Sequence, residues 1–233
     1  MTILRSTYAA FTAAVYDPFL ALGERRGMAA HRRALLAGAT GSVLEIGAGT
    51  GLNLEAHPPG QHPLVLTEPD PAMARRLERT AARQRPDAVV VRAGAEDLPF
   101  ADGTFDVVVS TLVLCTVPDP DAAVAELRRV LRPEGRLLYL EHVRSADPRL
   151  ARRQDRLAPA WRRFAAGCVC NRPTLELLAG AFTLAPPARA TWAGMPSIVH
   201  PLAIGTAVPR SAGAGRAREV AAVSGRPAPP STR

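Results

Sequence analysis

Short apolar runs alternate with longer amphipathic stretches from residue 42 to residue 143. The apolar runs have the length of strands, and the run at 105–114 is apolar on both faces, as an interior strand of a parallel sheet must be. The stretches between them place apolar residues at helical spacing and end at prolines or glycines. The pattern predicts five strands, at 42–47, 63–69, 88–94, 105–114 and 135–143, and two helices, at 71–84 and 119–132.

Helical patterns also flank this alternating region. Apolar residues recur at helical spacing from Tyr8 to Val15, and Pro18 breaks that run. Further helices are predicted at 22–37, 150–167 and 174–182, and two final strands at 188–194 and 201–208. We expect the final strands to close the sheet as an antiparallel pair. A chain that alternates strands and helices in this way forms an open, mostly parallel sheet with helices on both faces.

The composition fits one globular protein. The chain has 233 residues, of which 47% are hydrophobic, enough for one sizeable core. No apolar run approaches the length that spans a membrane, and the first thirty residues lack the pattern of a signal peptide. We therefore expect a cytoplasmic protein without an integral membrane segment.

The positive charge is uneven along the chain. The formal net charge is +8, but the segment from Pro209 onward holds five arginines against one glutamate and so carries +4 of it. That segment is rich in Ala, Gly, Pro and Ser, which is typical of disorder. We expect N-terminal helices at 1–40, one domain at 41–208 and a disordered basic tail at 209–233. Since every basic residue is Arg, composition bias explains the charge, and we expect no nucleic-acid partner.

Three cysteines, Cys115, Cys168 and Cys170, are present. An odd number without a secretion signal predicts free thiols. Cys168 and Cys170 are too few for a zinc site, and no histidine lies at ligand spacing beside them, so we expect no metal.

A glycine turn follows the first predicted strand. Gly47, Gly49 and Gly51 have the spacing G-x-G-x-G, and glycine there allows a ligand to approach the backbone. The dinucleotide fingerprint needs a glycine where this chain has Leu52, and the acid Glu45 would repel a phosphate. The turn therefore suits a cationic ligand group better than a pyrophosphate, although a purely structural turn tolerates the same glycines.

The ends of the next two strands carry further candidates. Glu68 is placed to accept hydrogen bonds from both hydroxyls of a ribose, or is an exposed loop acid. Gly94 and Ala95, followed by Glu96, leave room for a flat adenine ring.

These motifs together resemble a known family. The segments "VLEIGAGTG", "TEPD", "GAEDLPFADGTFDVVVS" and "AELRRVLRPEGRLLYLEHV" look like successive motifs of the class I S-adenosylmethionine-dependent methyltransferases, over roughly 43–143. The resemblance implies a three-layer Rossmann-like α/β fold, with a mostly parallel seven-stranded sheet, an antiparallel final strand and an N-terminal helical lid. It also implies S-adenosylmethionine as the cofactor.

The same resemblance assigns roles to individual residues. Gly47, Ala48, Gly49 and Gly51 correspond to the loop on the methionine side, Glu68 to the ribose ligand, and Ala95 with Glu96 to the adenine contacts. Many relatives have Asp where this chain has Gly94, so Glu96 or backbone makes the contact to the adenine amino group. The remaining cofactor contacts that we expect are Glu45, Asn53, Pro69, Gly94, Thr111 and Leu112.

A narrower likeness concerns the acceptor. The segments "TLVLCTV", "RRVLRPEGRLLYLEHV" and "CNRPT" resemble the methyltransferase-like 7 group, whose mammalian members methylate thiols, and the amino-terminal segment also fits the ubiquinone/menaquinone-biosynthesis methyltransferases. The mammalian relatives begin with an apolar membrane-associating segment, which this chain lacks, so we do not expect the membrane attachment of those relatives in this protein. We expect a small-molecule acceptor, with a thiol favoured.

Two residues are candidates for the catalytic chemistry. His142, beside Glu141 at the end of the fifth strand, is a possible base or a hydrogen-bonded structural histidine. Cys115, at the end of the fourth strand, lines the acceptor site or is a core thiol. Asp17, with Tyr16, closes a lid or only ends a helix.

Other functions remain open at this point. The acceptor can instead be a quinone or another metabolite methylated on carbon or oxygen. A nicotinamide-dependent oxidoreductase and a non-catalytic cofactor-binding scaffold are the alternatives from other classes. The sequence leaves the oligomeric state undetermined.

Overall fold

A computed structural model of the chain describes residues 17–60 and 63–210. The predictions for residues 1–16, which include Tyr16 and the first helix, and for the tail beyond residue 210 lie outside the described residues. Eight strands form one sheet in the order β3-β2-β1-β4-β5-β8-β6, and β7 also pairs with β8. The strands are β1 (Val43–Ile46), β2 (Leu64–Thr67), β3 (Val89–Val91), β4 (Phe105–Thr111), β5 (Leu131–His142), β6 (Phe182–Leu184), β7 (Ala188–Thr191) and β8 (Pro201–Pro209).

The first five strands are parallel, and β8 runs antiparallel to β5. Two short strands share the far side of β8, because β6 pairs with its end and β7 with its beginning. The sheet thus has seven positions, the last of which holds both short strands. The predicted mostly parallel sheet with an antiparallel final strand is confirmed.

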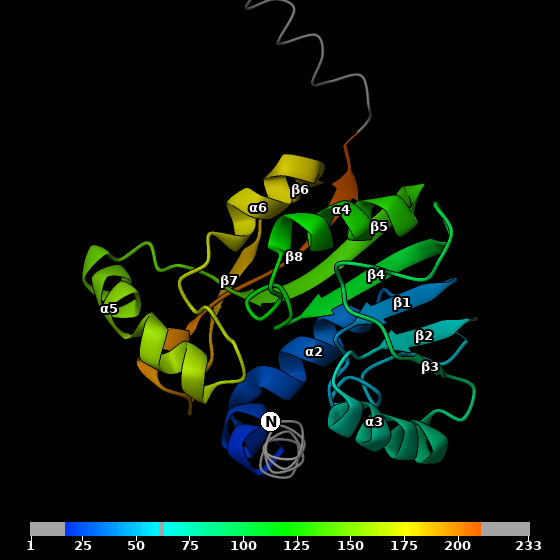
Figure 1. Ribbon diagram of the computed structural model, residues 1–233, viewed down its shortest axis with the longest axis horizontal. Coiled ribbons are helices and arrows are strands. Elements are labelled where there is room, and N and C mark those ends of the chain that lie inside the picture. Colours follow the sequence, from blue (N-terminus) through cyan, green and yellow to red (C-terminus); the bar gives the residue numbers. More distant parts are fainter. Residues whose placement is uncertain (1–16, 61–62, 211–233) are drawn as a thin grey trace, which may run out of the picture.

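Helices cover both faces of this sheet (Figure 1). They are α2 (Ala29–Leu36), α3 (Pro71–Gln84), α4 (Pro120–Val130), α5 (Pro148–Phe164) and α6 (Thr174–Ala181), together with a π-helical turn η1 (Glu24–Met28) and a 3₁₀ turn η2 (Ser197–Val199). Helices α4 and α6 pack on one face, where Leu127 and Leu178 join the core around Val108. Helices α2 and α3 pack on the other, where Leu36 and Leu77 join a second core. Burial of both faces explains the apolar strands.

Helix α3 has the bounds that the sequence predicts, because its ends are set locally. Asp70 caps it by accepting hydrogen bonds from the amides of Ala72 (2.8 Å) and Met73 (3.0 Å), and Pro71 occupies its first turn. The predicted helix at 22–37, in contrast, is interrupted. Gly27 has a φ of +129°, a backbone conformation outside the helical region, so α2 begins only at Ala29.

Other boundaries differ because of strand pairing. Helix α4 ends at Val130 instead of residue 132, since Leu131 pairs with Phe105 at the start of β5. Strand β4 ends at Thr111 instead of residue 114, because Leu112 has a φ of +60° and turns the chain. The short strand β6 was not predicted, and its Phe182 was assigned to the preceding helix. Such a strand exists only through its partner β8, which local sequence cannot indicate.

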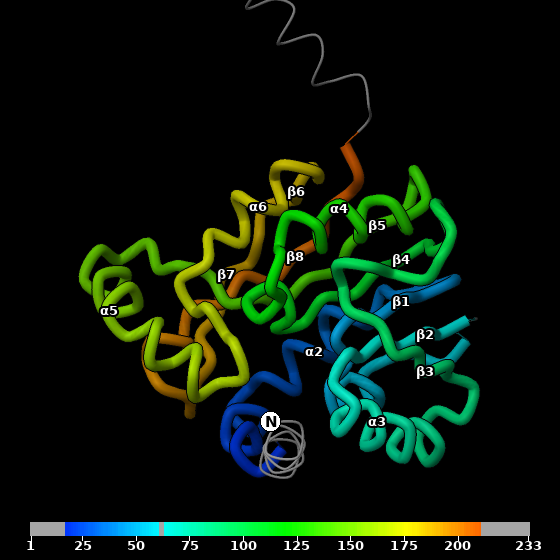
Figure 2. The backbone as a smooth tube through the Cα atoms, viewed as in Figure 1, coloured from blue at the N-terminus to red at the C-terminus, as the bar shows by residue number. Residues whose placement is uncertain are grey.

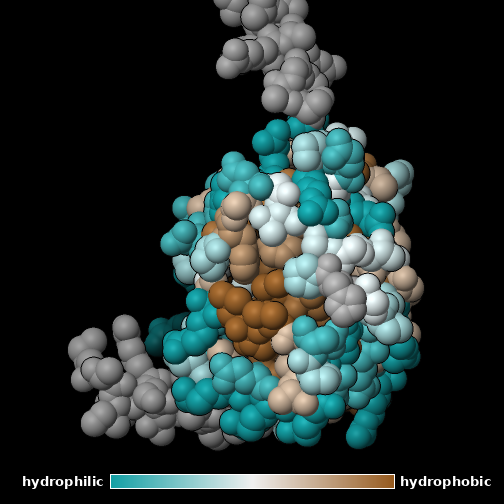
Figure 3. Space-filling model, turned by 90° about the vertical axis from the view of Figure 1, so that its right-hand side faces the viewer, coloured by the Kyte–Doolittle hydropathy of each residue, from teal (hydrophilic) through white to brown (hydrophobic). Residues whose placement is uncertain are grey.

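The surface carries both apolar and hydrophilic areas. In Figure 3 an apolar area lies near the middle of the face turned to the viewer, with hydrophilic residues around it. The described chain begins at the bottom of Figure 2 and ends at its top. No helix in the described part of the chain has the length and apolarity needed to cross a membrane.

Candidate functional site

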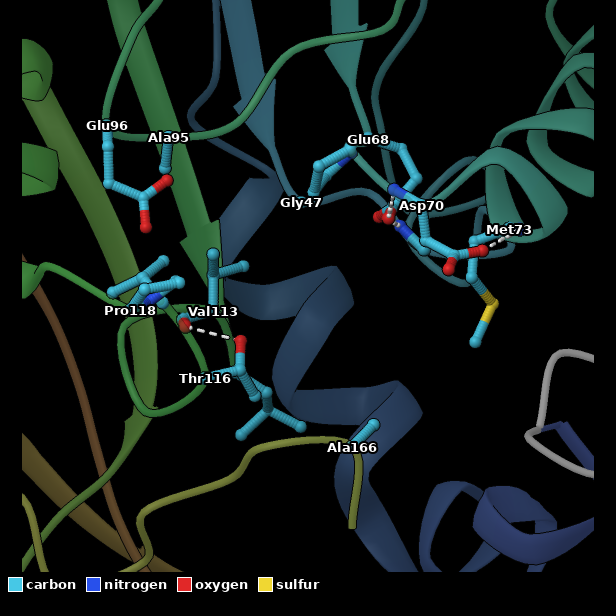
Figure 4. A pocket seen from close by; sticks show the side chains of 14 residues that line it. Gly47, Glu68, Asp70, Met73, Ala95, Glu96, Val113, Thr116, Pro118 and Ala166 are labelled. Atoms are coloured by element: carbon cyan, nitrogen blue, oxygen red, sulfur yellow. Dashed lines mark hydrogen bonds between the residues drawn. The ribbon is translucent and has the colours of Figure 1, made fainter. Parts of the chain in front are cut away.

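A cavity of about 350 Å³ opens beside the carboxyl ends of β1, β2 and β4 (Figure 4). Ligands of open parallel sheets bind at this end of the strands. Glu68 and Asp70 lie with Met73 on one side of the cavity, and Glu96 lies on the other side beside Ala95 (Figure 4). The lining residues are Gly47, Gly49, Glu68, Pro69, Asp70, Met73, Ala95, Glu96, Leu112, Val113, Thr116, Val117, Pro118 and Ala166. Seven predicted cofactor contacts are therefore brought together: Gly47, Gly49, Glu68, Pro69, Ala95, Glu96 and Leu112.

The turn after β1 approaches the turn after β4 closely. Gly47 has a φ of +54°, and a Cβ built on it would lie 2.8 Å from Cγ2 of Val113. That distance is shorter than carbon atoms tolerate, so only glycine fits. The absence of a side chain leaves the backbone of the turn open to the cavity.

Glu68, at the end of β2, ties that turn to the next strand. Its Oε2 accepts a hydrogen bond from the amide of Gly49 (2.9 Å), and its Oε1 accepts one from the amide of Asp70 (2.9 Å). Burial raises the pKa of the carboxyl group, although the two amides oppose the shift. A buried carboxylate with lone pairs left at the cavity is suited to ribose hydroxyls, and that assignment stays a prediction.

Glu45 and Asn53 lie beneath the glycine turn instead of in the cavity lining. The Asn53 side-chain amide donates to Glu45 Oε1 (3.0 Å) and to the hydroxyl of Thr111 (2.8 Å), and His57 Nε2 lies 2.6 Å from Glu45 Oε2. Arg32 of α2 donates to the side-chain Oδ1 of Asn53 (2.9 Å) and to the hydroxyl of Thr111 (3.3 Å). Through these contacts Glu45 holds the segment that follows the glycine turn.

Arg32 is the residue of this network that sequence reasoning missed. It is buried, and it also pairs with Glu24 (3.1 Å) across the kink between η1 and α2. A buried arginine in an N-terminal helix gives no local signal, because its partners come from three other segments. The N-terminal segment also touches the glycine turn directly, where the Thr50 hydroxyl donates to Asp17 (2.6 Å). This contact supports the predicted lid.

Four further predicted contacts do not reach the cavity lining. Ala48 and Gly51 belong to the glycine turn, Thr111 joins the network beneath it, and Gly94 lies beside Glu96. Their assignment to the cofactor, like that of Glu45 and Asn53, stays a prediction without a cavity contact to support it.

Glu141 shapes the apolar part of the lining. Its Oε1 accepts hydrogen bonds from the Ser110 hydroxyl (2.6 Å) and from the amides of Val113 (3.1 Å) and Leu114 (3.2 Å). Burial raises the pKa of Glu141 to about 7. The carboxyl group thereby fixes the turn that Leu112 begins with its left-handed φ. Both Glu141 and His142 are buried, because both faces of β5 are covered.

The two predicted catalytic residues lie together, yet apart from the cavity lining. His142 is buried against the Trp192 ring (5.3 Å between centroids), and burial lowers its pKa to about 4. Cys115 is buried and shares an apolar cluster with Cys168 and Trp192. Among the described residues that line the cavity, neither Cys115 nor His142 appears. A catalytic role for either residue stays a prediction, and the structural alternative fits their burial better.

Comparisons with known proteins support this fold. A model of the methyltransferase domain matches residues 44–139. The chain is 33% identical to phosphatidylethanolamine N-methyltransferase of Cereibacter sphaeroides over 71% of its own length and 84% of that protein. The chain belongs to the S-adenosylmethionine-dependent methyltransferases. Thiol S-methyltransferase TMT1B of Homo sapiens is 40% identical over 63% of this methyltransferase and 62% of its own length. The match thus spans less than two thirds of that relative.

A solved structure supports the fold of this methyltransferase. The N-methyltransferase NodS of Bradyrhizobium japonicum WM9, in complex with S-adenosylhomocysteine, has a TM-score of 0.59 at 18% identity and covers 81% of this chain and 88% of its own. Identity at that level shows a shared fold and leaves the acceptor open.

Proposed function

We propose that the protein transfers a methyl group from S-adenosylmethionine to the sulfur of a small apolar thiol. The observation that carries the proposal is the set of apolar side chains in the cavity lining. Glu68 and Asp70 lie on one side of the cavity and Glu96 on another (Figure 4), whereas Leu112, Val113, Val117, Pro118 and Ala166 form an apolar wall. Such a wall suits an apolar acceptor. The 40% identity with thiol S-methyltransferase TMT1B supports sulfur as its reacting atom.

The residues present fit the cofactor. Gly47 and Gly49 bring backbone without side chains to the cavity lining, and Glu68 presents a carboxylate there. Gly47 and Gly49 would hold the amino-acid part, Glu68 the ribose, and Ala95 with Glu96 the adenine. The cofactor supplies an activated methyl group on a sulfonium, so the task of these residues is positioning and exclusion of water. A thiol with a pKa of about 8.5 needs little help to form the thiolate.

A second candidate acceptor is an amine on a lipid. It is favoured by the match to phosphatidylethanolamine N-methyltransferase, of which the chain covers 84%. A quinol methylated on carbon or oxygen, the alternative that the sequence left open, is tested in the same assay.

One competition assay separates these acceptors. The full chain is incubated with methyl-labelled S-adenosylmethionine and an aliphatic thiol, phosphatidylethanolamine in micelles, or a reduced quinone, and the products are identified by mass. We expect methylation of the thiol at more than about tenfold the rate of the others. Glu68→Ala should abolish turnover, whereas Glu78→Ala, an exposed carboxylate on α3, should leave it unchanged. Methylation of the amine or quinol without thiol product would refute the proposal.

A further inference from the structure

Three potential metal ligands from distant segments meet behind the apolar wall. Cys115 follows β4, His142 ends β5, and Cys168 follows α5. All three are buried, and their ligand atoms lie within 4.8 Å of one another. Both cysteines are free thiols. No metal was expected from the sequence, because Cys168 and Cys170 alone are too few ligands and only the fold brings Cys115 and His142 to Cys168.

The His142 ring has a nitrogen that is free to bind. Its Nδ1 is buried and has no hydrogen-bond partner among the described residues, while the ring makes a hydrogen bond to the backbone of Val199. That bond must use Nε2, so the proton of the neutral ring is placed there. Metal-bound histidines are commonly oriented by such a hydrogen bond from the other ring nitrogen to a backbone carbonyl. Packing against Trp192 further fixes the ring.

A buried nitrogen without a hydrogen-bond partner, such as Nδ1 of His142, lowers the stability of the fold. The two neighbouring thiols are only weak hydrogen-bond donors and do not remove this cost. Two cysteine sulfurs and one imidazole nitrogen are the donor set that zinc prefers. In a tetrahedral zinc site the ligand atoms are separated by about 3.5–3.8 Å. The ligand atoms of the present cluster lie within 4.8 Å of one another, so each separation exceeds that spacing by at most about 1 Å.

A buried acid beside the cluster adds to the electrostatic argument. Glu141 interacts electrostatically with both thiols, and its Oε2 is buried without a partner among the described residues. A divalent cation would offset the negative charge of this carboxylate and of two thiolates. Arg172, the cation near the thiols, already donates to the carbonyls of Leu114 and Val117.

We propose that Cys115, His142 and Cys168 bind one Zn²⁺ ion, which joins the two loops that form the apolar wall. Binding replaces the two thiol protons, which pass to solvent. Cys115 adjoins the cavity residue Thr116, and Cys168 lies two positions after the cavity residue Ala166. The Val169 amide already donates to the Cys115 carbonyl (2.7 Å). The site does not depend on which acceptor is methylated.

Zinc content and cobalt spectra test this site on the full chain. Protein produced with added zinc and purified without chelators is analysed by elemental and native mass spectrometry. We expect one zinc per chain in the unchanged protein and in Cys170→Ser, which removes a buried thiol of the same loop outside the cluster. Cys115→Ser, Cys168→Ser and His142→Gln should each weaken zinc binding by more than about tenfold.

A second measurement decides the matter even if the ligand variants do not fold. The unchanged chain is stripped of metal under reducing conditions, its fold is checked by circular dichroism, and it is titrated with Co²⁺. We expect thiolate-to-cobalt charge-transfer absorption that saturates at one equivalent. A folded protein that binds neither zinc nor cobalt would overturn the proposal. So would equal loss of zinc in Cys170→Ser, or a Cys115–Cys168 disulfide in the protein isolated with zinc.

Discussion

Replacement of Gly47 by alanine tests whether the close approach of the two turns builds the cavity. The φ of +54° costs an alanine about 1–2 kcal/mol relative to glycine. The new Cβ would also lie 2.8 Å and 2.9 Å from the two methyl carbons of Val113. Overpacking of this kind costs about 1–3 kcal/mol. We therefore expect Gly47→Ala to lower the free energy of unfolding by about 2–5 kcal/mol.

Gly103→Ala is the matched control. Gly103 has a φ of +61°, and nothing lies within 4 Å of the Cβ that alanine would add. This variant should carry the backbone cost alone, about 1–2 kcal/mol. Urea unfolding of both variants measures the two free energies, and the difference between them isolates the crowding against Val113.

Calorimetric titration with S-adenosylhomocysteine connects this crowding to the site. Gly47→Ala should weaken binding by at least about tenfold, whereas Gly103→Ala should leave it unchanged. Adding Val113→Ala to Gly47→Ala should restore part of the stability, since neighbouring changes are not additive. Equal unfolding free energies for the two glycine variants, together with unchanged affinity, would refute the reasoning.

Three further outcomes are expected. Burial raises the pKa of Glu68 in the folded protein. The protonated carboxyl group therefore favours the folded state of the free protein, and this contribution to the free energy of unfolding is lost as the pH rises through the raised pKa. Ligand hydroxyls favour the charged form of Glu68, so the affinity for S-adenosylhomocysteine should fall as the pH is lowered through that pKa. In calorimetric titrations, Glu68→Gln should show no such pH dependence. Arg32→Ala leaves buried partners unpaired and should cost about 3–5 kcal/mol in urea unfolding, against less than about 0.5 kcal/mol for the exposed Arg33→Ala. Ala166→Gly relieves a φ of +48° and should raise stability by about 0.5–1 kcal/mol, which thermal unfolding measures.

Local signals account for the part of the fold that was predictable. Helix α3 depends on the Asp70 cap and Pro71, which lie next to each other in the sequence, and its bounds were predicted correctly. The alternation of apolar runs and helices indicated the sheet, and the glycine turn with Glu68 indicated one end of the cavity. These features depend on residues that are a few positions apart, so they can be predicted from the sequence alone.

Contacts between distant segments decided the rest. The hydrogen bond from Arg32 to Thr111 joins residues 79 positions apart, and Ser110 and Glu141, 31 positions apart, meet only because β4 and β5 are neighbours. The same strand order brings Cys115 and His142 together and leaves them outside the cavity lining. The sequence thus determined most of the elements, the family and the cofactor. Only the packing of strands and loops decided which side chains share a site, because that depends on which segments become neighbours in space.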